Sequence, residues 1–117
     1  MLNAIDEYFN QQEEPSKGVL LFLRNHILNF QSEITEVWRY KMPFYCYQGH
    51  RFCYLWVDKK TRQPYLGLVD GMRISNPLLV AGNRSRMKIL MLDANKNLPI
   101  KDINAILLDA LKLISKK

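Results

Sequence analysis

The sequence predicts a two-layer α+β domain, in which an antiparallel β-meander carries N-terminal helices and a C-terminal helix on one face. Three observations support this fold class. Apolar residues recur at helical spacing before residue 31 and again after residue 99, whereas alternating aromatic and β-branched residues dominate from Pro43 to Leu92. No repeat or linker divides the 117 residues, so we expect residues 1–117 to form one domain.

Three helices are predicted before the sheet. A short one covers residues 3–10, and a longer one starts at Pro15 and Ser16 and runs to about Phe30, with its apolar residues on one broad face. Ser32, followed by Thr35 and Glu36, resembles a helix-capping signal. It therefore predicts a third helix over residues 32–40, ended by Pro43.

A β-hairpin follows Pro43, with Gly49-His50 as a two-residue type II′ turn. This turn predicts the pairs Tyr47–Phe52, Cys46–Cys53 and Tyr45–Tyr54. One face of the hairpin would then point toward the helices and would hold Phe44, Cys46, Cys53, Leu55 and Val57. The other face would hold Tyr45, Tyr47, Phe52, Tyr54 and Trp56.

Two more strands and a last helix complete the prediction. A charged turn over residues 59–62 folds a third strand back, which pairs Leu55 with Leu66, Tyr54 with Gly67 and Trp56 with Tyr65. Residues 72–82 are expected to be irregular, and residues 86–92 to form a fourth strand. A final, largely buried helix starts at Pro99 or Asp102.

Composition and charge restrict the cellular location and the kinds of partner that can be expected. The net charge of +6 is concentrated between Arg51 and Leu92, where eight basic residues stand against two acidic ones. The sequence contains no apolar run long enough to cross a membrane, and its start lacks the pattern of a signal peptide. Two cysteines are too few for a disulfide framework. We therefore expect a cytoplasmic protein without a membrane partner.

The aromatic face of the sheet is the leading candidate site. With basic neighbours at its rim, it would suit an unidentified small ligand, a protein, or a second copy of the chain in a homodimer. The rings could instead be ordinary structural packing. Nucleic-acid binding is a weaker alternative, because no recognised nucleic-acid motif accompanies the rings. The candidate ligand-binding residues are Tyr45, Tyr47, Phe52, Tyr54, Trp56, Tyr65, Arg51 and Arg62.

Other chemistries have less support. Cys46, His50 and Cys53 could be read as soft metal ligands, but the predicted turn separates the histidine from the cysteines, and core packing is favoured for both thiols. No phosphate-binding glycine loop, nucleophile elbow or zinc-protease helix is present. The sequence therefore predicts a protein that is not an enzyme.

The stretch from Glu36 to Phe44, with Tyr40, Met42 and Pro43 at its centre, resembles the YdhG-like family of small bacterial domains of unknown function. The order of helices and strands over nearly the whole chain is similar too. This resemblance implies a frataxin-like fold, and iron as a possible cargo handled by a chaperone. The positions that could hold iron are Asp6, Glu7, Glu13 and Glu14, whose carboxylate oxygens suit a cation.

Overall fold

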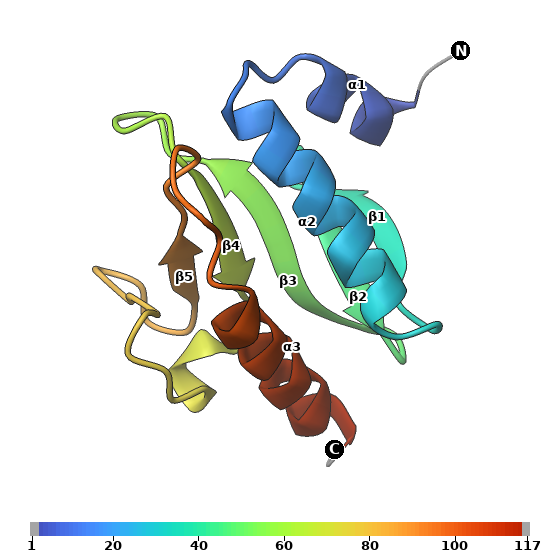
Figure 1. Cartoon of the computed structure of the whole chain (residues 1–117). Coiled ribbons are helices and arrows are strands. Elements are labelled where there is room, and N and C mark those ends of the chain that lie inside the picture. The colour runs from blue at the N-terminus through green and yellow to red at the C-terminus, as the bar shows by residue number, and fades with distance from the viewer. Residues whose placement is uncertain (1–2, 116–117) are drawn as a thin grey trace.

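The structure is a computed structural model that describes residues 3–115 (Figure 1). In chain order its elements are α1 (Ala4–Asn10), α2 (Ser16–Phe30), β1 (Thr35–Arg39), β2 (Met42–Tyr47), β3 (His50–Val57), β4 (Pro64–Leu68), the short 3-10 helix η1 (Gly71–Arg73), β5 (Lys88–Met91) and α3 (Ile100–Ser115). The two helices expected before residue 31 and the helix expected after Pro99 are confirmed.

The five strands form one antiparallel sheet in the order β1-β2-β3-β4-β5, so each strand pairs with its neighbour in the chain. Figure 1 shows α2 and α3 lying side by side across one face of this sheet, with α1 near the β1 end. This arrangement confirms the predicted α+β class. Among the helices of residues 3–115, none combines the length and apolar character that a membrane crossing requires.

The helix predicted over residues 32–40 is wrong, because most of that segment forms the edge strand β1. Its residues pair with β2 in a regular register that includes Glu36 with Tyr45 and Val37 with Phe44. The turn between the strands consists of Tyr40 and Lys41, which both have positive φ angles, of 52° and 61°. The backbone hydrogen bonds that β1 forms with β2 thus outweigh the local helix-capping signal.

The β2–β3 hairpin turns one residue earlier than predicted. Gln48 and Gly49 both have positive φ, the signature of a type I′ turn, so Tyr47 pairs with His50 and Cys46 with Arg51. Phe52 is then an extra residue on β3, because the next pair is Tyr45 with Cys53. All three predicted pairs of the hairpin are therefore wrong, and Cys46 and Cys53 do not face each other.

The changed register divides the hairpin's rings between two hydrophobic clusters. The main core, between the sheet and α2 and α3, contains Tyr45, Tyr47, Phe52, Cys53 and Leu55 together with the buried faces of the helices. The opposite side of the sheet, which we call the outer face, has its own cluster. This outer cluster consists of buried Phe44, Tyr54, Tyr65, Val69 and Ile89, with partly buried Val37, Met42, Trp56 and Met87.

One ionic network ties the first helices to the sheet. Arg24 on α2 donates to both carboxylate oxygens of Glu36 on β1, at 2.9 Å each, and to Asp6 on α1 at 3.0 Å. The Tyr45 hydroxyl donates to the same Glu36 at 2.8 Å. Arg24 also lies over the ring of Phe9, 4.7 Å from its centroid. Elements α1, α2, β1 and β2 therefore share a single, mostly shielded set of charges.

The pairing of β3 with β4 is confirmed at every predicted position. Opposite Tyr54 stands Gly67, and the tyrosine ring lies directly over it. A Cβ atom added at Gly67 would come within 2.1 Å of Tyr54 Cζ, far inside contact distance. Gly67 therefore allows the ring to lie flat on the sheet, where it packs within the outer cluster.

We expect Gly67→Ala to lower the free energy of unfolding by about 2 kcal/mol, because the new methyl group displaces the Tyr54 ring. Urea unfolding monitored by circular dichroism measures this loss. Gly49→Ala is the matched control, since it has open space around its Cβ and is affected only by its positive φ. In a Tyr54→Leu background, the stability that Gly67→Ala removes should be less than half of that removed in the wild-type background. An unchanged loss of stability would contradict the packing explanation.

Candidate functional site

The outer face is the side of the sheet opposite α2 and α3 (Figure 1), and the rings of the outer cluster form its floor. Phe44 stacks on Tyr54 with 5.0 Å between ring centroids, and Tyr54 meets Tyr65 edge-on at 6.1 Å. All three rings are buried; Tyr54 is only 5% exposed. The rings thus shield one another, and the floor is a second small core.

The predicted six-ring face is therefore wrong as a continuous exposed surface. Tyr45, Tyr47 and Phe52 lie in the main core, and Tyr45 is fully buried. The physical reason is the Phe52 bulge, because one extra residue on β3 exchanges the faces of the paired strands. The shift of the turn changes each partner by two residues and by itself leaves the faces unchanged. Of the six predicted rings, Tyr54, Trp56 and Tyr65 remain on the outer face, and Trp56 is the one left partly accessible.

Trp56 connects the two hydrophobic clusters through a tyrosine of α1. Its ring stacks on Tyr8 with 5.4 Å between centroids and an interplanar angle of 13°. Tyr8 packs against the main core and also meets Trp38 at 6.1 Å, while Trp56 packs against the outer cluster. The buried hydroxyl of Tyr8 has no hydrogen-bond partner among the described residues. Burial raises the pKa of this hydroxyl well above its ordinary value.

Two outer-face aromatic residues were not among the candidate ligand-binding residues. Phe44 was assigned to the helix face, and Tyr40 entered only through the family motif. Tyr40 is 71% exposed in the β1–β2 turn and contacts Phe44, with 5.8 Å between ring centroids. The guanidinium of Arg51 lies over both rings, at 5.4 Å and 5.7 Å. A turn at Gln48-Gly49 alone would still pair Phe44 with Cys53 of the main core, so only the Phe52 bulge brings Phe44 to the outer face.

Basic side chains surround this floor. Arg39 pairs with Met42 and shares its side of the sheet, and Arg84 lies close enough to the Tyr54 hydroxyl for its positive charge to offset part of the pKa rise that burial causes there. At the end of the sheet, Lys59 and Lys60 line a shallow hollow of about 360 Å³ with Trp56 and Tyr65. The basic rim, as we call it, consists of Arg39, Arg51, Lys59, Lys60 and Arg84.

The outer tyrosines are held in their neutral form. Desolvation by burial is the main reason that the pKa of Tyr54 is raised, and the positive charge of nearby Arg84 partly offsets this rise. Desolvation also raises the pKa of Tyr65 to about 12, with a further contribution from Tyr54. The rings and their hydroxyls thus form an uncharged surface inside a positive rim.

Arg62 and the acidic candidates lie elsewhere. Arg62 belongs to the β3–β4 turn and faces a separate polar hollow, where Glu13 and Glu14 also lie. Asp6 is bonded to Arg24, and Glu7 sits in the first turn of α1. Within residues 3–115 no three potential ligands among His, Cys, Asp and Glu come close enough to hold a metal ion. The structure therefore does not bring the four carboxylates together.

The two cysteines are free thiols in different surroundings. Cys53 is buried in the main core, and desolvation raises the pKa of its thiol well above the ordinary value. Cys46 is half-buried, and its thiol pKa is raised by burial despite the nearby positive charges of Arg51 and Arg39. Raised pKa values keep both as unreactive thiols.

Comparisons with known proteins add no relative. No family model matches the sequence, and neither a curated protein nor a solved structure does so at a significant level.

We expect Tyr8→Phe to leave the free energy of unfolding unchanged or to raise it by up to about 1 kcal/mol, because the variant removes a buried hydroxyl without a partner and keeps the ring stack. Tyr8→Ala should instead cost about 3 kcal/mol by removing the stack on Trp56. Chemical denaturation compares the two variants. A Tyr8→Phe variant as unstable as Tyr8→Ala would show that the hydroxyl is needed.

Stability should fall as the pH rises above about 10, where tyrosines of the unfolded chain ionise. The folded pKa of Tyr65 is raised to about 12 and that of Tyr54 is also raised, so their stabilising contribution is complete below pH 10 and is lost as the pH climbs through the folded value. Absorbance at the tyrosinate band and circular dichroism, recorded together, test this. Tyr65→Phe should weaken the pH dependence; an identical profile would contradict the assignment.

Proposed function

We propose that this chain is a non-enzymatic binding domain whose outer sheet face holds an anionic ligand that contains a flat ring. The observation that carries the proposal is the basic rim around a neutral aromatic floor, on the face that α2 and α3 leave free (Figure 1). An aromatic wall next to cations attracts a ligand that combines a ring with a negative charge.

The hollow beside the β3–β4 turn supports this ligand class most directly. Trp56 and Tyr65 supply ring surface, whereas Lys59 and Lys60 supply two exposed ammonium groups. Neither ammonium group has a hydrogen bond or ion pair within the described structure, although the Asp58 carboxylate lines the same hollow and attracts Lys60. A ring seated against Trp56 would thus bring its anionic group within reach of free cations, at no cost of breaking existing pairs.

A homodimer through this face has less support, because a symmetric contact would bring two copies of the basic rim together. Single-stranded nucleic acid is the second candidate. It is favoured by Arg39, Arg51 and Arg84, which extend the positive charge along the sheet beyond the hollow. Iron handling has no comparable support, since the four candidate carboxylates are separated.

Membership of the YdhG-like family and a cytoplasmic location remain part of the proposal. The α+β order of elements supports the first. The motif residues Tyr40, Met42 and Pro43 lie at the β1–β2 turn and the start of β2, next to the proposed binding face. Two cysteines in the free thiol form are compatible with a reducing compartment.

Titration with adenosine 5′-monophosphate, followed by the indole N–H signal of Trp56, tests the proposal. We expect the signal to shift, and Lys59→Ala/Lys60→Ala to weaken binding by about tenfold or more, because two free cations are lost. Lys101→Ala/Lys112→Ala, which removes two exposed cations from α3 on the other face, is the matched control and should bind normally.

The absence of a Trp56 shift at millimolar nucleotide would contradict the small-ligand proposal. Equal losses in both double variants would mean non-specific attraction to positive charge. A single-stranded oligothymidine that binds when the mononucleotide does not, with strong salt dependence and loss on Arg51→Ala, would favour the second candidate.

A further inference from the structure

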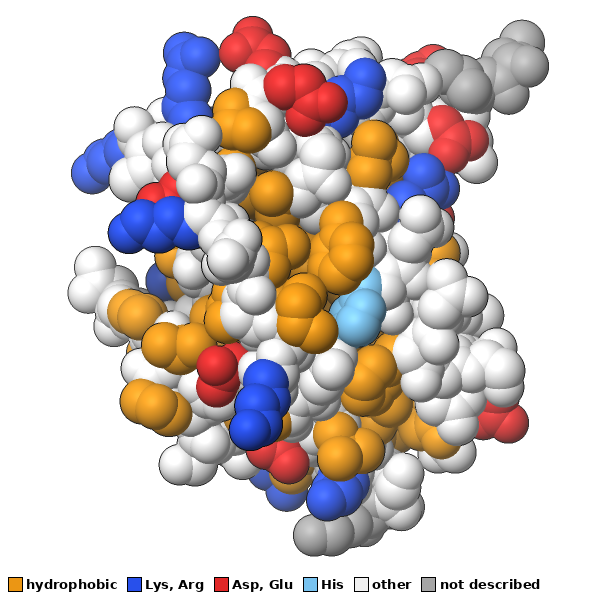
Figure 2. Space-filling view, in the orientation of Figure 1, with side chains coloured by type: hydrophobic (Ala, Val, Ile, Leu, Met, Phe, Trp, Pro, Cys, Tyr) orange, Lys and Arg blue, Asp and Glu red, His pale blue; other side chains and the backbone are white. Residues whose placement is uncertain are grey.

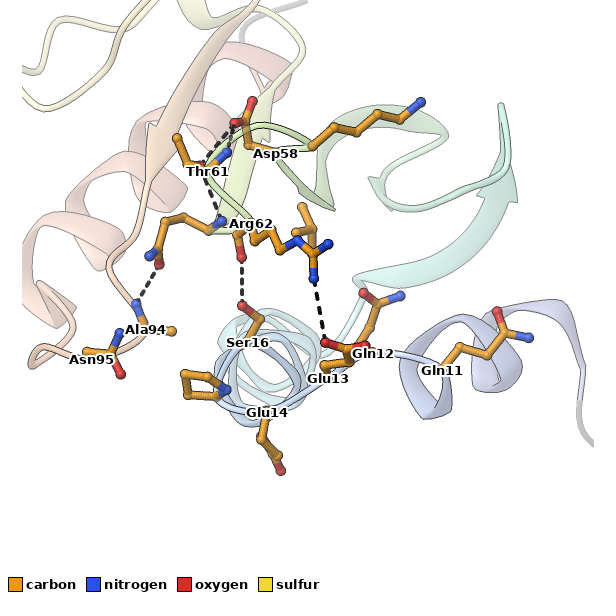
Figure 3. Close-up of a pocket in the computed structure, with 14 residues that line it drawn as sticks. Gln11, Gln12, Glu13, Glu14, Ser16, Asp58, Thr61, Arg62, Ala94 and Asn95 are labelled. Atoms are coloured by element: carbon orange, nitrogen blue, oxygen red, sulfur yellow. Dashed lines mark hydrogen bonds and ion pairs between the residues drawn. The ribbon is translucent and has the colours of Figure 1, made fainter.

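A second hollow of about 510 Å³, whose lining residues are drawn in Figure 3, lies beside the same β3–β4 turn and shares Val57, Asp58 and Lys59 with the aromatic one. Three segments that are far apart in the sequence enclose it. They are the α1–α2 linker over residues 11–16, the turn over residues 57–63, and residues 94 and 95 before α3. Its walls are mostly polar, and no aromatic side chain lines it. A flat ring therefore has nothing to stack on here, unlike at the outer face.

Hydrogen bonds between the three segments fix these walls. Ser16 donates to the backbone carbonyl of Arg62 at 3.0 Å, and the amide of Ala94 donates to Gln63 at 3.0 Å (Figure 3). Asp58 accepts from the backbone N–H and the hydroxyl of Thr61, at 2.8 and 3.0 Å. The hollow is thus held open by contacts among its own lining residues.

Three charges in this hollow remain largely uncommitted, namely Lys59, which lines both hollows, and the opposite charges of Arg62 and Glu13. Nη1 of Arg62 lies 3.9 Å from Oε2 of Glu13, which is beyond hydrogen-bond distance, and the two side chains are 82% and 86% exposed. Such an exposed pair contributes little to stability. By contrast, Glu14 and Asp58 already accept bonds from the protein, Glu14 from the N–H of Gly18. Arg62 and Glu13 therefore keep their bonding capacity for a third molecule.

The backbone at Arg62 supports a role for its side chain. Its φ angle is 61°, in the left-handed region where glycine is preferred, and its N–H bonds to the carbonyl of Asp58 at 2.8 Å. Glycine would close the same turn without steric cost. An arginine at this position strains the turn and places a guanidinium at the hollow, toward Glu13 in Figure 3.

We propose that this hollow binds a small zwitterion of the amino-acid type, with its carboxylate on Arg62 and its ammonium group on Glu13. A guanidinium binds a carboxylate through two parallel hydrogen bonds, and a carboxylate accepts from an ammonium group. Such a ligand inserts between two charges that are weakly paired and replaces that pair with two stronger contacts. The side-chain amides of Gln11 and Asn95, which also line the hollow, can bond a polar ligand side chain.

L-Glutamine is the test probe, followed by amide chemical shifts of the full chain. We expect millimolar glutamine to shift signals of residues 12–16 and 61–63. N-acetylglutamine lacks the ammonium group and glutamine amide lacks the carboxylate, so each should bind about tenfold more weakly or worse. Analogues that bind as well as glutamine, or no shift at these residues, would overturn the proposal.

The variants Arg62→Gly and Glu13→Gln should each weaken glutamine binding by about tenfold or more. Arg62→Gly should also raise the melting temperature, because it relieves the strained turn. Gln48→Gly is the matched control, since it relieves positive φ at the β2–β3 turn and should leave glutamine binding unchanged. Normal glutamine binding by Arg62→Gly would overturn the assignment.

The two hollows share Val57, Asp58 and Lys59, but the groups assigned to the zwitterion, Arg62 and Glu13, line only the second one. Mononucleotide binding at Trp56 should persist in Arg62→Gly, and glutamine binding should persist in Trp56→Phe. Loss of both ligands in both variants would mean a general disturbance of the turn and would overturn the claim of a separate zwitterion site.

Discussion

The bidentate pair between Arg24 and Glu36 determines which side of the sheet the side chains of β1 and β2 occupy. Glu36 must point toward α2 to meet the guanidinium, so its cross-strand partner Tyr45 also points into the main core and donates to the same carboxylate. Val37 and Phe44, one residue further along each strand, then point outward. The outer cluster thus follows from a charge interaction on the opposite face of the sheet, and α1 is tied to the same network through Asp6.

An antiparallel sheet with helices on one face usually leaves the other face polar, but this one carries a second hydrophobic cluster. Side chains of the sheet itself shield this cluster from water, without a third layer of secondary structure. Tyr54 lies flat because Gly67 has no side chain, Phe44 stacks against it, and Arg51 covers Phe44 with its guanidinium. Arginine suits this position because it can lie on aromatic rings while its charge stays in water. Apolar packing and a positive surface are therefore features of the same side chains on this face. On the helix-bearing face, apolar side chains form a band through the middle and most charged side chains lie around it (Figure 2).

Sequence patterns located most elements because their signals were local. The register of β3 with β4 could be predicted because a charged turn separates two strands whose apolar residues alternate clearly. Strand β1 could not be predicted in this way, because Tyr40 and Lys41 form the turn after it without glycine or asparagine. Only the pairing with β2 stabilises this strand. At the next hairpin Gly49 is compatible with two turns that differ by one residue, and no local feature indicates the Phe52 bulge. The larger hollow joins segments distant in sequence, so its lining residues could not be grouped beforehand, whereas the hollow beside Trp56 is lined within the single β3–β4 hairpin.

The two edges of the sheet differ in one further respect. Val80 exchanges backbone hydrogen bonds of 2.9 Å with Ile89, so the free side of β5 is already occupied at its centre. At the opposite edge, no described strand pairs with the outer side of β1. Fibril growth by strand addition requires two open edges, one to receive a chain and one to offer. A second copy of the chain that paired with β1 would offer no further open edge, because its own β5 edge is blocked by Val80. The loop that precedes β5 therefore protects the sheet against open-ended polymerisation.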